Sequence, residues 1–160
     1  MTTFNLPFLT EQFARDALRA ILDEHPDLGR FGFRQRGTNP AVHDAHRKID
    51  DEFLMEFCFA ATWLVRQRQV KRPQAGSYGL KHFAERSLGS YVSNGALIAA
   101  AIHLGFPIER RGSGPNASLG VARRLDLISD EHEKRLLEWV TSGMLGQESR
   151  YWCYSDQEAV

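Results

Sequence analysis

Apolar residues follow helical spacing through the middle of the chain, from Pro40 to about Gln69. Within this stretch, residues 53–65 (FLMEFCFAATWLV) are apolar at almost every position, a pattern typical of a helix that is buried on all sides. Asn39 suits the N-cap and Pro40 suits the first helical position, so this pair predicts where the helix begins. We therefore expect one long central helix over about residues 40–69, with the other elements packed around it.

Four shorter helices are predicted by apolar stripes that lie between capping residues, glycines and prolines. They cover about residues 11–25, 77–88, 94–104 and 131–142. The glycine-containing connections also fit a short β piece within residues 30–36 or 117–125. The predicted fold is mainly α: a compact helical bundle that forms a single domain over residues 1–160.

The composition favours a folded protein of the cytoplasm. Of the 160 residues, 42% are apolar and 25% are charged, which argues against disorder. Cys58 lies in the apolar run and Cys153 is the only other cysteine, so we expect a reducing compartment and no disulfide framework. The start of the chain lacks the basic region of a signal peptide, and no apolar run reaches ~18 residues, so we expect no membrane span. No P-loop, GxGxxG, GxSxG, HExxH or CxxC motif occurs, and we expect no cofactor.

Positive charge is concentrated in the middle of the sequence. The chain has 20 basic and 20 acidic residues, yet residues 66–124 hold ten basic and two acidic ones, a net charge of +8. Clustered Arg and Lys side chains bind phosphates and displace counterions from nucleic acid, so this block predicts a phosphate-binding face. The candidate binding residues are its ten cations: Arg66, Arg68, Lys71, Arg72, Lys81, Arg86, Arg110, Arg111, Arg123 and Arg124. In the alternative interpretation, the acidic last helix folds back and pairs with them, or the charges disperse over the surface.

Residues 78–106 have the layout of a helix-turn-helix motif, with Gly89 in the turn and Ser93 as the cap of the second helix. A DNA-reading helix needs polar side chains near its start, but here Asn94 is followed almost entirely by Gly, Ala, Leu and Ile. This composition is typical of a closely packed core helix. The start of the helix could still bind an anion through the N–H groups of Ser93, Asn94 and Gly95, or Asn94 and Gly95 could merely shape the turn.

The same region carries a longer sequence motif. It comprises Tyr78-Gly79-Leu80-Lys81-His82, Glu85, Tyr91-Val92-Ser93-Asn94-Gly95-Ala96-Leu97-Ile98-Ala99-Ala100 and His103-Leu104-Gly105-Phe106. The motif resembles one in small proteins carried by bacterial phages, plasmids and integrated elements. This resemblance implies a mobile genetic element as the setting, where small proteins often regulate transcription or block host defences, CRISPR effectors included. It assigns no catalytic residue.

Two enzyme hypotheses also fit the sequence. His43, His46 and Asp50 lie at i, i+3 and i+7, so one face of the long helix could present all three to a metal ion. His82 with Glu85, three residues later, could form an acid–base pair. The structural alternatives are a solvated helix face for the first set and an ordinary hydrogen bond for the second.

Taken together, these patterns predict a non-enzymatic binding protein of a mobile genetic element. It would engage nucleic acid or a nucleoprotein complex through the basic 66–124 face, for example as an anti-CRISPR-type inhibitor. The alternatives are a small metal-dependent or acid–base enzyme and a helix-turn-helix regulator that binds DNA. The sequence leaves the partner's identity and the oligomeric state open.

Overall fold

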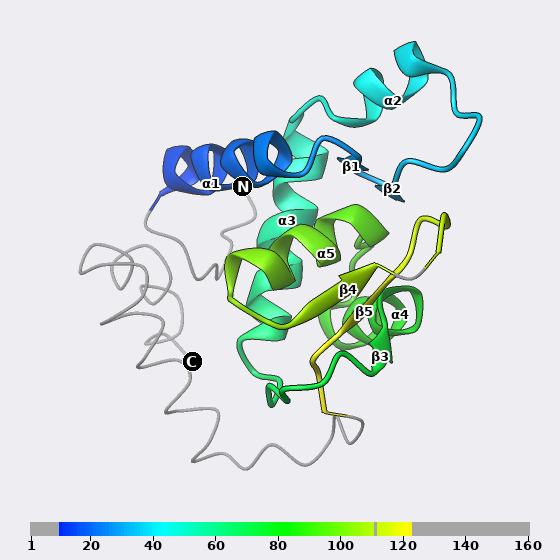
Figure 1. Cartoon of the computed structure of the whole chain (residues 1–160). Coiled ribbons are helices and arrows are strands. Elements are labelled where there is room, and N and C mark those ends of the chain that lie inside the picture. The colour runs from blue at the N-terminus through cyan, green and yellow to red at the C-terminus, as the bar shows by residue number, and fades with distance from the viewer. Residues whose placement is uncertain (1–9, 111, 123–160) are drawn as a thin grey trace.

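A computed structural model of the chain describes residues 10–110 and 112–122 (Figure 1). These residues form five helices: α1 (Glu11–Glu24), α2 (Pro40–His46), α3 (Asp51–Leu64), α4 (Ser77–Leu88) and α5 (Asn94–His103). Two small antiparallel sheets accompany them. One pairs β1 (Leu28–Gly29) with β2 (Gly32–Phe33), and the other has β5 (Ala117–Leu119) between β3 (Ala75–Gly76) and β4 (Ile108–Arg110). The helix predicted over 131–142 lies outside the described residues.

The expectation of a mainly helical bundle around one long helix over residues 40–69 is wrong. The segment forms two separate helices, α2 and α3, and α3 ends at Leu64. The break arises because the Asp50 side chain accepts a hydrogen bond from the amide of Phe53 at 2.8 Å and so begins a new helix. With two sheets beside the five helices, the described part of the chain is mixed α and β rather than a bundle.

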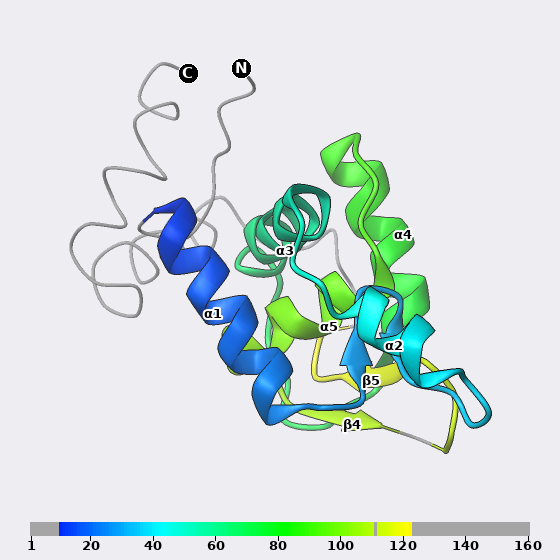
Figure 2. The same cartoon turned by 90° about the horizontal axis from the view of Figure 1, so that it is seen from above.

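The core is centred on α3 and α5, which lie between α1 and α4 (Figure 2). Phe53 and Phe57 of α3 are fully buried, as predicted from the apolar run, and so is Leu97 of α5. The three alanines at 99–101 are also fully buried, and their small side chains allow neighbouring elements to approach closely. This packing makes α3 and α5 the scaffold to which the remaining segments attach.

Both ranges expected to hold a short β piece contain strands. β2 lies within 30–36 and pairs with β1 as a hairpin, with Leu28 opposite Phe33. β5 lies within 117–125, where it pairs with both β3 and β4. The pairing of β3 with β5 joins segments far apart in the sequence, which periodicity alone could not predict.

The helix caps agree well with the sequence. Thr10 caps α1 by accepting a hydrogen bond from the amide of Phe13 at 3.0 Å. α4 covers the predicted residues and ends at Gly89, whose φ of 67° is the left-handed conformation that glycine adopts readily. Ser93 caps α5, as expected, by accepting from the amide of Ala96.

Candidate nucleic-acid interface

A connector of residues 65–74 joins α3 to β3 and carries four of the ten candidate cations. Its backbone runs beside β5 and is fixed there by hydrogen bonds. The amide of Val70 donates to the carbonyl of Gly120 at 2.8 Å, and the amide of Ala122 donates to the carbonyl of Arg68 at 2.9 Å. The connector is therefore an ordered platform for its side chains, although it has no helical or extended run of its own.

Three cations of the connector, Arg68, Lys71 and Arg72, are exposed, whereas Arg66 is half-buried. Within residues 10–110 and 112–122, none of the three exposed side chains forms an ion pair with a carboxylate. Exposed cations of this kind remain hydrated and accessible to an anionic partner.

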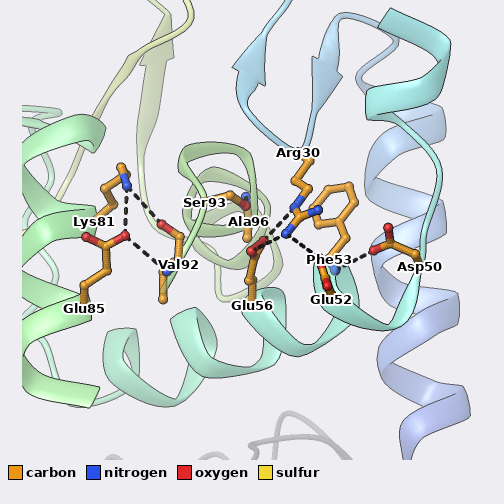
Figure 3. Close-up of polar contacts among 10 residues, drawn as sticks. All are labelled: Arg30, Asp50, Glu52, Phe53, Glu56, Lys81, Glu85, Val92, Ser93 and Ala96. Atoms are coloured by element: carbon orange, nitrogen blue, oxygen red, sulfur yellow. Dashed lines mark hydrogen bonds and ion pairs between the residues drawn. The ribbon is translucent and has the colours of Figure 1, made fainter. Parts of the chain in front are cut away.

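Lys81, in contrast, is withdrawn from the surface. Its ammonium group donates to the Glu85 carboxylate at 2.8 Å and to the carbonyl of Val92 at 3.3 Å (Figure 3). Burial alone would raise the pKa of Glu85, but hydrogen bonds from Lys81 and from the amide of Val92 hold that pKa below its ordinary value. Lys81 therefore neutralises an internal carboxylate instead of adding to an accessible basic face.

Of the other candidate cations, Arg86 is exposed and Arg110 is engaged within the protein. Arg86 is exposed, and its guanidinium group lies 4.5 Å from the ring centre of Phe83. Arg110 is half-buried and donates to the carbonyl of Arg34 at 2.7 Å and to Asp27 at 3.4 Å. Arg111, Arg123 and Arg124 lie outside the described residues.

Two tyrosines flank the buried lysine. Tyr78 is 56% exposed and Tyr91 is 53% exposed. The Nζ atom of Lys81 lies 5.8 Å from the ring centre of Tyr78 and 4.7 Å from that of Tyr91, within reach of cation–π attraction. We call these residues, together with His82 and Glu85, the tyrosine–lysine cluster.

The predicted pairing of His82 with Glu85 is present in this cluster. The Nδ1 atom of His82 lies 3.0 Å from a carboxylate oxygen of Glu85, and the His82 ring packs edge-on against Tyr78 with the ring centres 4.7 Å apart. The Glu85 carboxylate is shared with Lys81 and the amide of Val92, so it serves as the hub of a positioning network.

The proposed metal ligands on one helix face are not brought together, because the chain leaves the helix between residues 46 and 51. His43 is buried with Nε2 2.8 Å from the carbonyl oxygen of Pro26, His46 packs against an aromatic ring, and Asp50 caps α3. Among the described residues, no three His, Cys, Asp or Glu side chains form a group that could hold a metal ion.

The start of α5 is occupied by other parts of the protein. The amide of Gly95 donates to the carbonyl of Arg30 at 2.8 Å, and the Asn94 side chain donates to the carbonyl of Pro115 at 3.1 Å. A Cβ on Gly95 would overlap the carbonyl oxygen of Gly29. Residues 94–101 are all buried, so they present no polar face that could read base edges.

The sequence pattern did not predict the half-buried ion pair between Arg30 and Glu56. Arg30 donates to both oxygens of Glu56, at 3.0 and 2.7 Å, and to Glu52 at 3.2 Å (Figure 3). The hydrogen bond with Glu56 is the main reason that the pKa of Arg30 is raised. The signal was Glu56 itself, because a carboxylate inside an apolar run needs a cationic partner.

A surface pocket of about 280 Å³ lies at the end of α1. An arginine that lines it is engaged in hydrogen bonds that stabilise the fold. Arg47, which lines it, donates to the carbonyls of Leu22 and Leu28 at 2.6 and 2.7 Å. This guanidinium group thus supplies hydrogen bonds to carbonyl oxygens of α1 and of the strand that follows, as a C-terminal cap does.

No family model matches the chain, and searches of curated proteins and of solved structures found no significant match. None of the helices in the described residues has the length and apolar character needed to cross a membrane.

Proposed function

We propose that this protein is a non-enzymatic binding protein that engages nucleic acid, free or within a nucleoprotein complex, through the basic connector. The observation that carries the proposal is the exposure of Arg68, Lys71 and Arg72 on an ordered backbone, without carboxylate partners in the described ranges. Such cations contribute little to stability but release counterions when they neutralise phosphates.

The resemblance of the motif in residues 78–106 to proteins of phages and plasmids supports a mobile genetic element as the setting. In that setting, we expect the protein to act in the cytoplasm against a nucleoprotein complex of host defence, such as a CRISPR effector. A phosphate-binding face suits this role, because such complexes hold guide and target strands whose phosphates are ligands for exposed cations.

Charge reversal of the connector tests the proposal. The triple variant Arg68→Glu, Lys71→Glu, Arg72→Glu should bind a labelled oligonucleotide roughly tenfold more weakly or worse, as measured by fluorescence anisotropy. Its melting temperature should stay within about 2 °C of the wild type, because substitutions of exposed charges change stability little.

A matched control reverses three exposed cations elsewhere, namely Arg19, Arg36 and Lys48. It changes the net charge of the protein equally and should retain most of the affinity. Equal losses in both variants would assign binding to overall charge and contradict a local interface. A connector variant that unfolds would instead indicate internal pairing with the acidic residues beyond 124, and the proposal would fail.

A further inference from the structure

The tyrosine–lysine cluster holds two exposed aromatic rings close together. Because one Lys81 ammonium lies 5.8 Å from the ring centre of Tyr78 and 4.7 Å from that of Tyr91, the two centres can be no farther apart than these distances combined. A separation within this limit allows the two rings to contact bases of the same extended strand. Both side chains remain more than half exposed.

Polar contacts beneath the rings keep them in position. Lys81 is fixed by Glu85 and by the carbonyl of Val92. Tyr78 packs against His82, which is itself held by Glu85 at 3.0 Å. The Tyr78 ring is thus packed without being buried, and the Tyr91 ring lies 4.7 Å from the fixed Lys81 ammonium, so less ordering is needed when a ligand stacks on them.

Cations stand on the same helix and on the segment that precedes it. Arg86 is exposed on α4, and the connector with Lys71 and Arg72 leads through β3 directly into α4 and Tyr78. Aromatic platforms combined with backbone-binding cations are the arrangement by which proteins hold single strands of nucleic acid. A duplex does not offer this contact, because its base faces are already stacked on one another.

We propose that the nucleic acid bound by this protein is single-stranded and that its bases stack on Tyr78 and Tyr91. This inference rests on the proposed function and names its ligand class. The phosphates of the strand then lie on the exposed cations, while the tyrosines supply a contact that depends little on sequence, because every base has a π face.

Affinity for matched oligonucleotides tests the inference. The wild type should bind a mixed-sequence single strand more tightly than the duplex of the same sequence. The variant Tyr78→Ala, Tyr91→Ala should lose roughly 5- to 150-fold in single-strand affinity for each tyrosine removed. The variant Tyr78→Phe, Tyr91→Phe keeps both rings and should stay within about threefold of the wild type. Phe31→Ala, which removes an exposed aromatic ring from the β1–β2 hairpin, is the control for a general loss of surface apolarity.

A second measurement uses the unmodified protein and does not depend on how the variants fold. Photocrosslinking to a single strand that contains 5-iodouracil should attach the oligonucleotide at Tyr78 or Tyr91, as located by mass spectrometry of the peptides. Crosslinks confined to other residues would overturn the inference.

The outcomes separate this inference from the proposed function. If the alanine variant keeps its single-strand affinity, or if the wild type prefers the duplex, while reversal of the connector charges still abolishes binding, stacking is wrong and the polyanion-binding function stands. If the wild type binds neither oligonucleotide, both proposals are overturned.

Discussion

Single charged residues in this protein fall into two groups according to burial. Arg30 with Glu56 and Lys81 with Glu85 form ion pairs in which each partner is largely withdrawn from water. A buried charge persists only with a partner and with its hydrogen bonds satisfied, so these four residues serve the fold. The exposed connector cations remain in contact with water, so the fold does not require them to have a carboxylate partner.

The Arg30–Glu56 pair can be separated experimentally from its exposed neighbour. Glu56→Ala should lower the free energy of unfolding by roughly 1–3 kcal/mol, because it removes the main partner of a half-buried guanidinium group. Glu52→Ala removes a carboxylate that contacts the same Arg30 but is 77% exposed, and it should cost less than about 1 kcal/mol. Urea titrations of both variants make the comparison, and equal losses would show that burial does not determine the value of the pair.

His103 should make stability depend on acidity. Burial lowers its pKa to about 4, and its ring packs edge-on against the rings of Phe13 and Phe57. The unfolded chain takes up this proton near pH 6.5, so the folded state loses stability as the pH falls from about 6.5 towards 4 and is unaffected above that range. The loss due to this residue approaches about 3 kcal/mol.

Urea titrations at pH 7 and pH 4.5 measure this effect, with His103→Asn as the comparison. The variant should lose less stability than the wild type over the same interval, because it lacks the titrating ring. Identical losses in the two proteins would mean that other groups account for the acid sensitivity.

At the scale of elements, α5 packs closely against the β1–β2 hairpin because the side chains at its start are small. Gly95 lies against the carbonyls of Gly29 and Arg30, and a Cβ on Gly32 would overlap the carbonyl oxygen of Pro115 and the side chain of Asn94. The β1–β2 hairpin therefore packs directly on the start of α5, and this contact blocks the anion site that the sequence had allowed.

Two glycine substitutions test this close approach. Gly95→Ala should destabilise the protein by roughly 1–3 kcal/mol or more, because backbone carbonyls cannot move away as a flexible side chain can. Gly79→Ala, at an exposed position of α4 with no atom within 4 Å of the added Cβ, should stabilise it by about 0.5–1 kcal/mol. Thermal unfolding shows whether each variant is more or less stable than the wild type. A Gly95→Ala variant with unchanged stability would contradict the close packing at the start of α5.

Elements were predictable from the sequence where the signal was local. The caps at Asn39 and Ser93 depend on residues two or three positions away, and both agree with the structure. The break between α2 and α3 was missed because helical periodicity outweighed the capping signal of Asp50 followed by acidic residues. The pairing of β3 with β5 depends on residues far apart, so only the approximate position of β5 could be predicted.

At the scale of the whole molecule, the candidate interface was partly readable from the sequence. The place of the four connector cations between a buried run and Pro73 predicts that all of them are exposed. Arg68, Lys71 and Arg72 are exposed, whereas Arg66 is half-buried. The internal role of Lys81 had a local signal, since Glu85 lies four residues later on the same helix. The contact of Arg110 with Asp27 joins residues 83 positions apart and could not be predicted.

The salt dependence of binding tests the central claim most directly, namely that the connector cations neutralise phosphates. The dissociation constant of a labelled single strand is measured by anisotropy from low to physiological salt, for the wild type and for the Arg68→Glu, Lys71→Glu, Arg72→Glu variant. If the three cations each contact a phosphate, the log–log slope of the variant should be shallower than that of the wild type by about 2 to 3. Equal slopes in the two proteins would contradict the account, because the ligand would then release the same number of counterions without these side chains.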